Sequence, residues 1–484
     1  MIFFLWFESF IWFHQQKQPT MSEQKNKQLK IIFLSSEGAG HINACVGLAQ
    51  ELAKCGHEIY FFNKPSNIGQ FEKLGFKEII LHENAVVDDT DKKQVKTDNK
   101  DDNDQGKLRE TIIKSNLLAD LSPYDQLDVF DRHKNKNFFG FAIINDIRKI
   151  HEQIQQSLSE QKPDLVIVDY ILIPPCIAYG QIPWAYLCSH NPLHLFNSQL
   201  LPPITSGLPT DNRSGWADFY DKFRKTYQSS LQYCQNELNK HYQCPEVNKN
   251  QFLFLSPHFN IYGYPEQLDY TDIITLPENV VRLDGFCRQQ STTTTDDNDN
   301  KTFELPENIK TRLSDTVKLI YFSLGTFGST NVTLMQKILN ELAGCPHQII
   351  VSTGQSHQQL SLSENMYGQS YLPQMSILPL VDLVITHGGN NTVTETMSYG
   401  KPMIVMPLFA DQHDNAQRIM EKGFGYRINP HRFESNQLIQ LIQQILLDKI
   451  MIERCTNAGD LIRKSNSKWK ACTKIEKLLN NKKE

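Results

Sequence analysis

The sequence lacks several patterns that would mark a metalloprotein, a disulfide-stabilised protein or a nucleic-acid binder. Its ten cysteines are scattered along 484 residues and form no C-x-x-C pair, which argues against a zinc site and a disulfide framework. It has no cluster of Lys and Arg with interleaved aromatics, and its formal net charge is -5, whereas nucleic-acid binding requires a basic face. We therefore expect reduced thiols in a cytoplasmic protein with no nucleic-acid partner.

An apolar run long enough to cross a membrane is also missing. The opening MIFFLWFESFIWF is strongly apolar, but it is short for a span and contains Glu8. It lacks the basic start and the small-residue cleavage site of a signal peptide. Met21 opens a polar lead-in to the first predicted strand, so we expect translation to begin at Met21 and predict no stable membrane anchor. A membrane-contacting segment at residues 1–20 is the alternative.

What is present is an alternation of apolar runs and amphipathic helices in both halves of an ordinary globular composition, with 40% hydrophobic and 21% charged residues. Continuous apolar runs between helices are typical of parallel strands that are covered on both faces. The length suits two such α/β domains. The predicted strands are residues 30–35, 58–62, 164–169 and 184–188 in the first half and 317–323, 348–352, 383–386 and 403–406 in the second.

Polar segments divide the chain. Residues 289–301 read QQSTTTTDDNDNK, a composition that cannot form a core and indicates a linker. Residues 86–106 are similarly polar and are predicted to form a loop. Asp-x-Asp triplets within these two segments resemble metal motifs, but their low-complexity setting favours solvated runs, so we predict no metal. The expected division is an extension (1–28), a first domain (29–288), a linker (289–305), a second domain (306–450) and a terminal helix (451–484) that packs back on the first domain.

The densest group of chemically useful residues lies at 371–412. The predicted strand 383–386 ends at His387, and Gly388 and Gly389 let the backbone turn and approach a ligand closely. A helix then begins near Asn391. Its free N–H groups and its dipole would favour a phosphate at this N-terminus, and a partly cationic His387 would assist a leaving diphosphate.

Polar side chains continue beyond this turn. Thr392 adds a donor, Glu395 lies about one turn further on, and Asp411 and Gln412 follow the next strand at the same edge of the sheet. Each has a plainer interpretation: Thr392-x-x-Glu395 also reads as a capping box, and Asp411 as a helix-starting carboxylate. Their joint occurrence favours a ligand site.

This stretch, YLPQMSILPLVDLVITHGGNNTVTETMSYGKPMIVMPLFADQ, resembles the signature block of the UDP-glycosyltransferase superfamily, the inverting enzymes that glycosylate small lipophilic acceptors. It is closest in appearance to the bacterial macrolide-type branch and its eukaryotic relatives. The resemblance implies the GT-B fold, in which two Rossmann-like domains with parallel sheets face each other across a cleft. Residues 29–288 would then bind the acceptor and residues 306–450 the UDP-sugar.

The resemblance assigns the nucleoside end of the donor as follows. Tyr371 stands where the family usually has a Trp that stacks on uracil, and a Tyr still offers a ring face. Leu372 would contact uracil through its backbone. Gln374 and Glu395 match the ribose contacts.

The phosphate and sugar contacts follow in the same way. His387, Asn391 and Thr392 match the diphosphate contacts, beside the turn residue Gly389. Asp411 and Gln412 match the pair that hydrogen-bonds the donor sugar, a pair that leans toward glucose. Asn390 replaces the Trp of the plant version. Thr326, in a Ser-Leu-Gly-Thr turn that resembles the family's Ser-x-Gly-Ser, would lie near the β-phosphate.

The first half carries a second turn, Gly38-Ala39-Gly40-His41, directly after the first strand. It fails the dinucleotide fingerprint, because the third glycine position is Asn43. It resembles instead the family's Gly-x-Gly-His-x-x-Pro turn, with Ala44 in place of Pro, and the resemblance makes His41 the general base. Asp169 ends the DLVIVD strand where the family places the carboxylate that orients this base.

This assignment meets a chemical need. A hydroxyl is a weak nucleophile, and a neutral imidazole can take its proton as the new bond forms. A carboxylate partner would hold the ring and stabilise its charged form. His190 and His194, in the loop HNPLH, are further candidates for contacts with the acceptor.

The sequence therefore predicts an enzyme that moves a hexose, with glucose favoured, from a UDP-sugar co-substrate to a hydroxyl of a small lipophilic acceptor, with inversion and without a cofactor. A UDP-sugar epimerase of the same fold and a non-catalytic UDP-sugar-binding protein are the alternatives. A nicotinamide dehydrogenase is disfavoured by Asn43.

Overall fold

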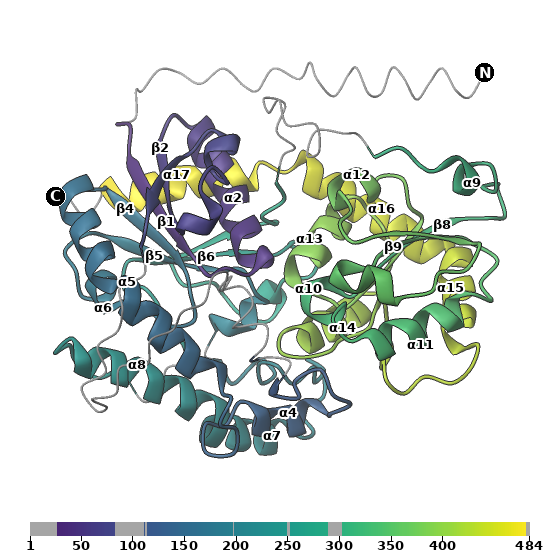
Figure 1. Cartoon of the computed structure of the whole chain (residues 1–484), viewed down its shortest axis with the longest axis horizontal. Coiled ribbons are helices and arrows are strands. Elements are labelled where there is room, and N and C mark those ends of the chain that lie inside the picture. Colours follow the sequence, from purple (N-terminus) through teal and green to yellow (C-terminus); the bar gives the residue numbers. More distant parts are fainter. Residues whose placement is uncertain are drawn as a thin grey trace.

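Two parallel sheets organise the computed structural model, which describes residues 27–82, 111, 114–196, 198–248, 252–288 and 303–480 (Figure 1). The first sheet has the strand order β3-β2-β1-β4-β5-β6-β7, and the second has the order β10-β9-β8-β11-β12-β13. Every strand pairing in these two sheets is parallel. The α/β class with two Rossmann-like domains is thereby confirmed.

The strands of the first sheet are β1 (Lys30–Ser35), β2 (Glu58–Asn63), β3 (Lys77–Ile80), β4 (Leu165–Asp169), β5 (Trp184–Cys188), β6 (Phe259–Gly263) and β7 (Val280–Leu283). Those of the second are β8 (Leu319–Ser323), β9 (Gln348–Ser352), β10 (Met366–Gln369), β11 (Leu383–Thr386), β12 (Met403–Val405) and β13 (Gly425–Arg427). All predicted strands are present. The sequence prediction missed β3, β6, β7, β10 and β13.

Helices cover both faces of the first sheet. One face packs on α5 (Phe139–Gln161) and α8 (Ser229–His241). The other face packs on α2 (Ala39–Lys54) and α17 (Ser467–Asn480). This double covering explains why all side chains of β4 and β5 are buried.

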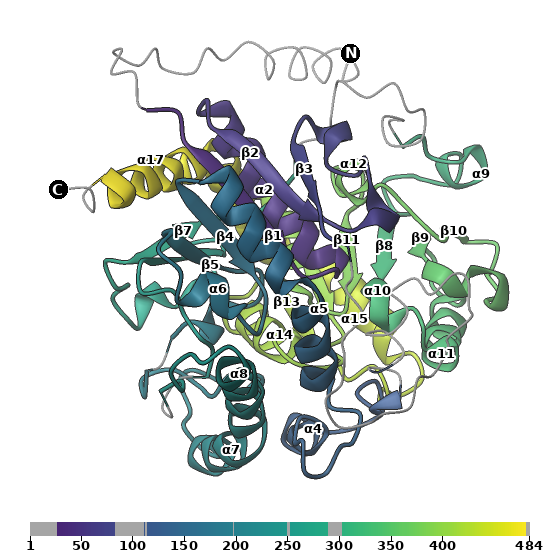
Figure 2. The same cartoon turned by 60° about the vertical axis from the view of Figure 1, so that its left-hand side comes forward.

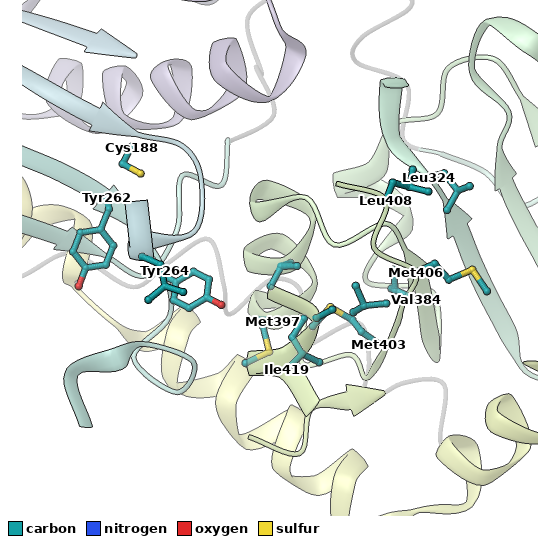
Figure 3. Packing of buried hydrophobic residues seen from close by; sticks show 14 of the residues in the cluster. Cys188, Tyr262, Tyr264, Leu324, Val384, Met397, Met403, Met406, Leu408 and Ile419 are labelled. Atoms are coloured by element: carbon teal, nitrogen blue, oxygen red, sulfur yellow. The ribbon is translucent and has the colours of Figure 1, made fainter. Parts of the chain in front are cut away.

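The larger of the two hydrophobic clusters extends across both domains. It continues from Tyr262 and Tyr264 in the first domain to Met397 and Met403 in the second (Figure 3). Helices α13 (Asn390–Ser398) and α14 (Gln412–Glu421) belong to this part of the second domain. The remaining α-helices are α4 (Pro123–Val129), α6 (Pro175–Ala178), α7 (Trp216–Phe223), α9 (Glu307–Lys310), α10 (Gly325–Gly328), α11 (Val332–Leu342), α12 (Gln374–Ile377), α15 (Gln437–Leu447) and α16 (Lys449–Lys464).

The strand order reverses once in each sheet, and these points position the candidate site. In the first sheet the order turns between β1 and β4, and in the second between β8 and β11. Ligands of open α/β sheets bind at the carboxyl ends of strands at such a switch point. His41 follows β1 and Asp169 ends β4, whereas Ser323 ends β8 and His387 follows β11.

The C-terminal segment crosses between the domains. Helix α16 packs on α13 of the second domain, and α17 lies beside α2 and β7 of the first (Figure 2). The prediction of one terminal helix is wrong, because Ser465 is extended (ψ 142°) and separates α16 from α17.

Some sequence predictions fall outside the described residues. They concern the start at Met21, the loop 86–106, the linker segment 289–301 and the Asp-x-Asp triplets. Within the described residues, no helix is both long and apolar enough to span a membrane. In the same part of the chain, no group of three or more His, Cys, Asp or Glu side chains is arranged to hold a metal ion.

Candidate active site

His41, in the first turn of α2, is held by side chains from two other strand ends. Its Nδ1 lies 2.9 Å from Oδ1 of Asp169, the last residue of β4. Ser189 Oγ, directly after β5, lies 2.9 Å from the same Nδ1 and donates to Asp169 Oδ1 at 3.2 Å. Gly38 is needed beside the ring, since a Cβ there would come 2.9 Å from His41 Cδ2. The arrangement leaves Nε2 of a neutral His41 as the nitrogen that can accept a proton.

Two opposing effects act on the pKa of His41. Burial disfavours the charged imidazolium, but the charge and the hydrogen bond of Asp169 favour it and raise the pKa above 6.5. Asp169 itself is 1% exposed. An imidazole with a buried carboxylate partner and a raised pKa is suited to take a proton and to hold the resulting charge.

Ser189 belongs to no motif of the sequence and was not predicted. Two neighbouring histidines, His190 and His194, are half-buried. The His190 ring lies edge-on to the His41 ring at 5.1 Å between centroids, and the His194 ring stacks on His190 at 5.1 Å. Burial lowers the pKa of both, that of His194 to about 3. Both are therefore neutral groups beside the candidate base.

A second group of predicted residues meets on α12 and α13. Gln374 Nε2 donates to Glu395 Oε2 at 2.5 Å and to Thr392 Oγ1 at 3.4 Å, and its Oε1 accepts from Tyr321 Oη at 3.2 Å. Burial raises the pKa of Glu395. Leu372 is buried, whereas its neighbour in sequence, Tyr371, is 66% exposed. The amide and carboxylate are thus preassembled, and the Tyr371 ring is free to stack.

The capping-box interpretation of Thr392 and Glu395 is wrong. The N-cap of α13 is Gly389, so Thr392 lies inside the helix, and Glu395 is engaged by Gln374. As a glycine, Gly389 offers no capping side chain. The N-cap position therefore leaves the first N–H groups of α13 to other partners, such as a phosphate.

Glycines pack closely around His387. Gly325 has φ +69°, and a Cβ there would come 2.5 Å from the His387 ring; a Cβ at Gly389 would come 2.6 Å from its Nε2. Gly388 has φ +88°. Thr326 follows Gly325 and is exposed at the start of α10. The turn thus places Thr326 at the carboxyl end of β8, next to His387, which follows the neighbouring strand β11.

The expected charge of His387 is wrong. Burial lowers its pKa to about 4, so the imidazole is neutral near pH 7. The sequence pattern had indicated a partly cationic ring. A neutral ring can still donate one hydrogen bond to a phosphate, but it brings no positive charge.

Asp411 and Gln412 lie at the start of α14 with different partners. Asp411 occupies the N-cap position, yet its side chain does not cap the helix. Its Oδ2 accepts instead from the backbone N of Asn191 in the first domain at 2.9 Å. Gln412 Oε1 accepts from Leu408 N at 2.9 Å. Ala410, which directly precedes Asp411, has φ +52°, a strained backbone conformation for a residue other than glycine.

Two hydrogen bonds join the N-terminus of α13, in the second domain, to the first domain that carries His41. Asn391 Nδ2 donates to Gly40 O at 2.7 Å, and Asn390 Nδ2 donates to Gly263 O at 3.1 Å. The N-terminus of α13 therefore abuts the turn that carries His41. Asn191, which was not predicted from the sequence either, is completely buried at this junction.

Comparisons with known proteins bear on both halves. A family model described as "UDP-glucoronosyl and UDP-glucosyl transferase" matches residues 297–461. An uncharacterised UDP-glucosyltransferase, YdhE of Bacillus subtilis (strain 168), is 29% identical over 464 residues, 93% of this chain and 96% of its own. A UDP-glucuronosyltransferase, 3A1 of Bos taurus, is 31% identical over 167 residues, and the match spans 33% of this chain and only 31% of that relative.

Among solved structures, the glycosyltransferase of kitacinnamycin is similar in fold. Its TM-score is 0.63 at 17% sequence identity, and the alignment covers 94% of this chain and 99% of that one. At this identity the likeness concerns the fold alone.

Proposed function

We propose that this chain, which has the GT-B fold, is an enzyme of the UDP-glycosyltransferase superfamily, and that it transfers a hexose, preferably glucose, from a UDP-sugar to a hydroxyl of a small lipophilic acceptor with inversion. The observation that carries this proposal is the junction of α2 and α13. There the His41–Asp169 pair of one domain meets the donor residues of the other, through Asn391 and Gly40.

In the proposed reaction, His41 acts on the acceptor. Asp169 and Ser189 hold Nδ1, so Nε2 takes the proton of the acceptor hydroxyl as its oxygen attacks the anomeric carbon. The bond from that carbon to the phosphate oxygen breaks on the opposite side, and UDP leaves with the electron pair. A single in-line displacement of this kind inverts the anomeric centre. Asp169 then stabilises the imidazolium.

The donor would lie along the second domain. Tyr371 would stack on uracil, and Gln374 and Glu395 would bind the ribose, for which purpose their present hydrogen bond would open. The uncapped N-terminus of α13 and a hydrogen bond from neutral His387 would stabilise the diphosphate. We propose that this happens without a metal, with charge stabilisation coming from the helix terminus.

The sugar would compete with a present interdomain contact. Asp411 now accepts from Asn191 N, and burial raises its pKa. A sugar hydroxyl that binds Asp411 would replace the Asn191 contact. Substrate entry therefore requires the domains to separate and close again.

A cavity of about 40 Å³ lies at the carboxyl ends of β1 and β2, and Ile42, next to His41, is one of its lining residues. Its lining is mixed, with apolar residues such as Phe62 beside the charged Glu37 and Lys64. It is too small to hold a whole acceptor, so the lipophilic class of the acceptor is proposed from the resemblance to the family.

The direct assay incubates the full chain with UDP-glucose and a panel of phenols, sterols and macrolides, and measures UDP release. We expect release that depends on an acceptor. Conversion of the UDP-sugar without an acceptor would indicate an epimerase, and tight UDP binding without turnover would indicate a binding protein.

A further inference from the structure

Helices α2 and α17 come from opposite ends of the chain and pack in register. Lys468 Nζ lies 3.8 Å from Glu51 Oε1, and His57 Nε2 lies 3.0 Å from Glu476 Oε1. The two contacts follow one another in the same order along both segments. The helices therefore run side by side, and residues between these pairs face each other.

Cys55 and Cys472 occupy the facing positions. Cys55 comes four residues after Glu51, and Cys472 comes four residues after Lys468, one helical turn in each case. Cys472 belongs to the buried cluster beneath these two helices and Cys55 packs against that cluster, so the two thiols are neighbours. Cys472 is fully buried, whereas Cys55, which follows the last residue of α2, is half-buried.

The environment distinguishes the two thiols. Cys55 is the more exposed, so a small disulfide can reach it, and the buried Cys472 next to it can resolve the mixed disulfide. The neighbouring Cys472 thiol and Lys54 also lower the pKa of Cys55, against burial and the nearby Glu51 and Glu476.

A second pair of cysteines provides the contrast. Cys176 and Cys244 are also near each other, but burial raises the pKa of both. Cys244 is half-buried, like Cys55. It is therefore a matched thiol without the activating neighbour.

We propose that Cys55 and Cys472 form a reactive dithiol that takes low-molecular-weight disulfides as substrate and closes an intramolecular disulfide between α2 and α17. The Cys55 thiolate attacks one sulfur of the small disulfide, whose S–S bond breaks and releases one thiolate. Cys472 loses its proton and attacks the Cys55 sulfur of the mixed disulfide, releasing the second thiol. The two protein thiols are oxidised, and the small disulfide is reduced to two thiols.

The new bond fastens the C-terminal helix to the helix that begins next to His41. It closes a loop that spans nearly the whole described chain, which restricts the unfolded state and raises the melting temperature. Helix α16 packs on the second domain, whereas α17 packs on the first. The disulfide therefore joins α17 to the first domain and forms no bond to the second.

The test treats the full chain with glutathione disulfide at neutral pH, blocks remaining thiols with N-ethylmaleimide and maps peptides by mass spectrometry. We expect a Cys55–Cys472 cross-link, a rise in Tm that dithiothreitol reverses, and glutathione retained on Cys55 in Cys472→Ser. Cys244→Ser should behave like the wild type. In timed alkylation of the reduced protein, Cys55 should react several-fold faster than Cys244.

Two results would overturn the proposal. One is a wild-type protein that keeps glutathione on Cys55 without a cross-link. The other is a Tm shift on oxidation that is equally large in Cys472→Ser. If Cys472→Ser is poorly folded, Cys472→Ala and the alkylation rates of the unmodified wild type decide the same question.

Discussion

At the scale of single residues, the proposed mechanism makes the hydrogen bond between His41 and Asp169 the determinant of the pH dependence. With His41 as the base, catalysis requires its neutral form, and Asp169 raises its pKa, so kcat/KM should rise with pH through a value above 6.5. In Asp169→Asn the charge is lost, so this limb should move to lower pH and the plateau should fall by roughly a hundredfold or more. Steady-state pH profiles test both effects. An unshifted limb in Asp169→Asn would contradict the pairing.

Ser189 is expected to act as a positioning residue for the same pair. Ser189→Ala removes the hydroxyl that contacts both His41 Nδ1 and Asp169 Oδ1. We expect kcat to fall by roughly tenfold, as the loss of about one hydrogen bond implies, with KM for UDP-glucose unchanged. Ser189→Thr keeps the hydroxyl and should restore most of kcat. A loss of activity that tracks only a loss of Tm in both variants would show a merely structural role.

The two motifs predicted which residues lie close together better than they predicted the charge of those residues. His41, Asp169, Gln374, Thr392 and Glu395 could be selected because each lies in a recognisable local pattern. Ser189 and Asn191 follow β5, outside any motif, and only the neighbouring position of β4 and β5 in the sheet brings them to the site. The neutral state of His387 depends on burial by distant segments, which a local pattern does not contain.

At the scale of secondary structure elements, the turn from β8 into α10 leaves space for His387. Gly325→Ala places a Cβ 2.5 Å from that ring and also forces alanine into φ +69°. We expect weaker binding of the UDP-sugar, seen as a higher KM and a higher Kd for UDP, together with a loss of stability of more than about 1 kcal/mol, because the clash with His387 adds to the backbone strain.

Gly56→Ala separates these two effects. Gly56 has φ +91°, but a Cβ added there would meet no atom of the described residues within 4 Å. The variant should lose only the stability that backbone strain costs, about 1 kcal/mol, while its Kd for UDP stays that of the wild type. Equal Kd values for UDP in both variants would argue against a role of the β8–α10 turn in donor binding.

Local sequence patterns predicted most of the central strands, but they did not predict where helix α13 begins. The apolar runs predicted eight strands, because burial on both faces leaves a continuous apolar signal. The edge strands β3, β10 and β13 are short and partly polar, and their signal is weak. The pattern Thr392-x-x-Glu395 indicated a cap at Thr392, but α13 begins at Asn390, whose side chain donates to Gly263 O of the first domain.

At the scale of the whole molecule, buried hydrogen bonds hold the domains in a closed arrangement. Asp414 accepts from Thr205 N at 2.6 Å and from Gly207 N at 2.9 Å across the interface. Asp414→Ala leaves both backbone N–H groups without this partner, at a cost of roughly 1–3 kcal/mol for a buried group. We expect a lower Tm and a larger radius of gyration by small-angle X-ray scattering.

Asp460→Ala is the matched control, because Asp460 forms exposed ion pairs within α16. It should leave both quantities near their wild-type values. An Asp414→Ala protein as compact as the wild type would show that these bonds do not set the closed state.

The measurement that tests the central claim most directly compares the wild type with His41→Ala for both turnover and UDP binding. We expect acceptor-dependent UDP release to fall by roughly a hundredfold to ten-thousandfold, since a general base is lost, while the Kd for UDP by calorimetry stays close to the wild-type value. His133→Ala, an exposed histidine remote from the motifs, should change neither. Full UDP release by a folded His41→Ala protein would contradict the assignment of the base and with it the proposed mechanism.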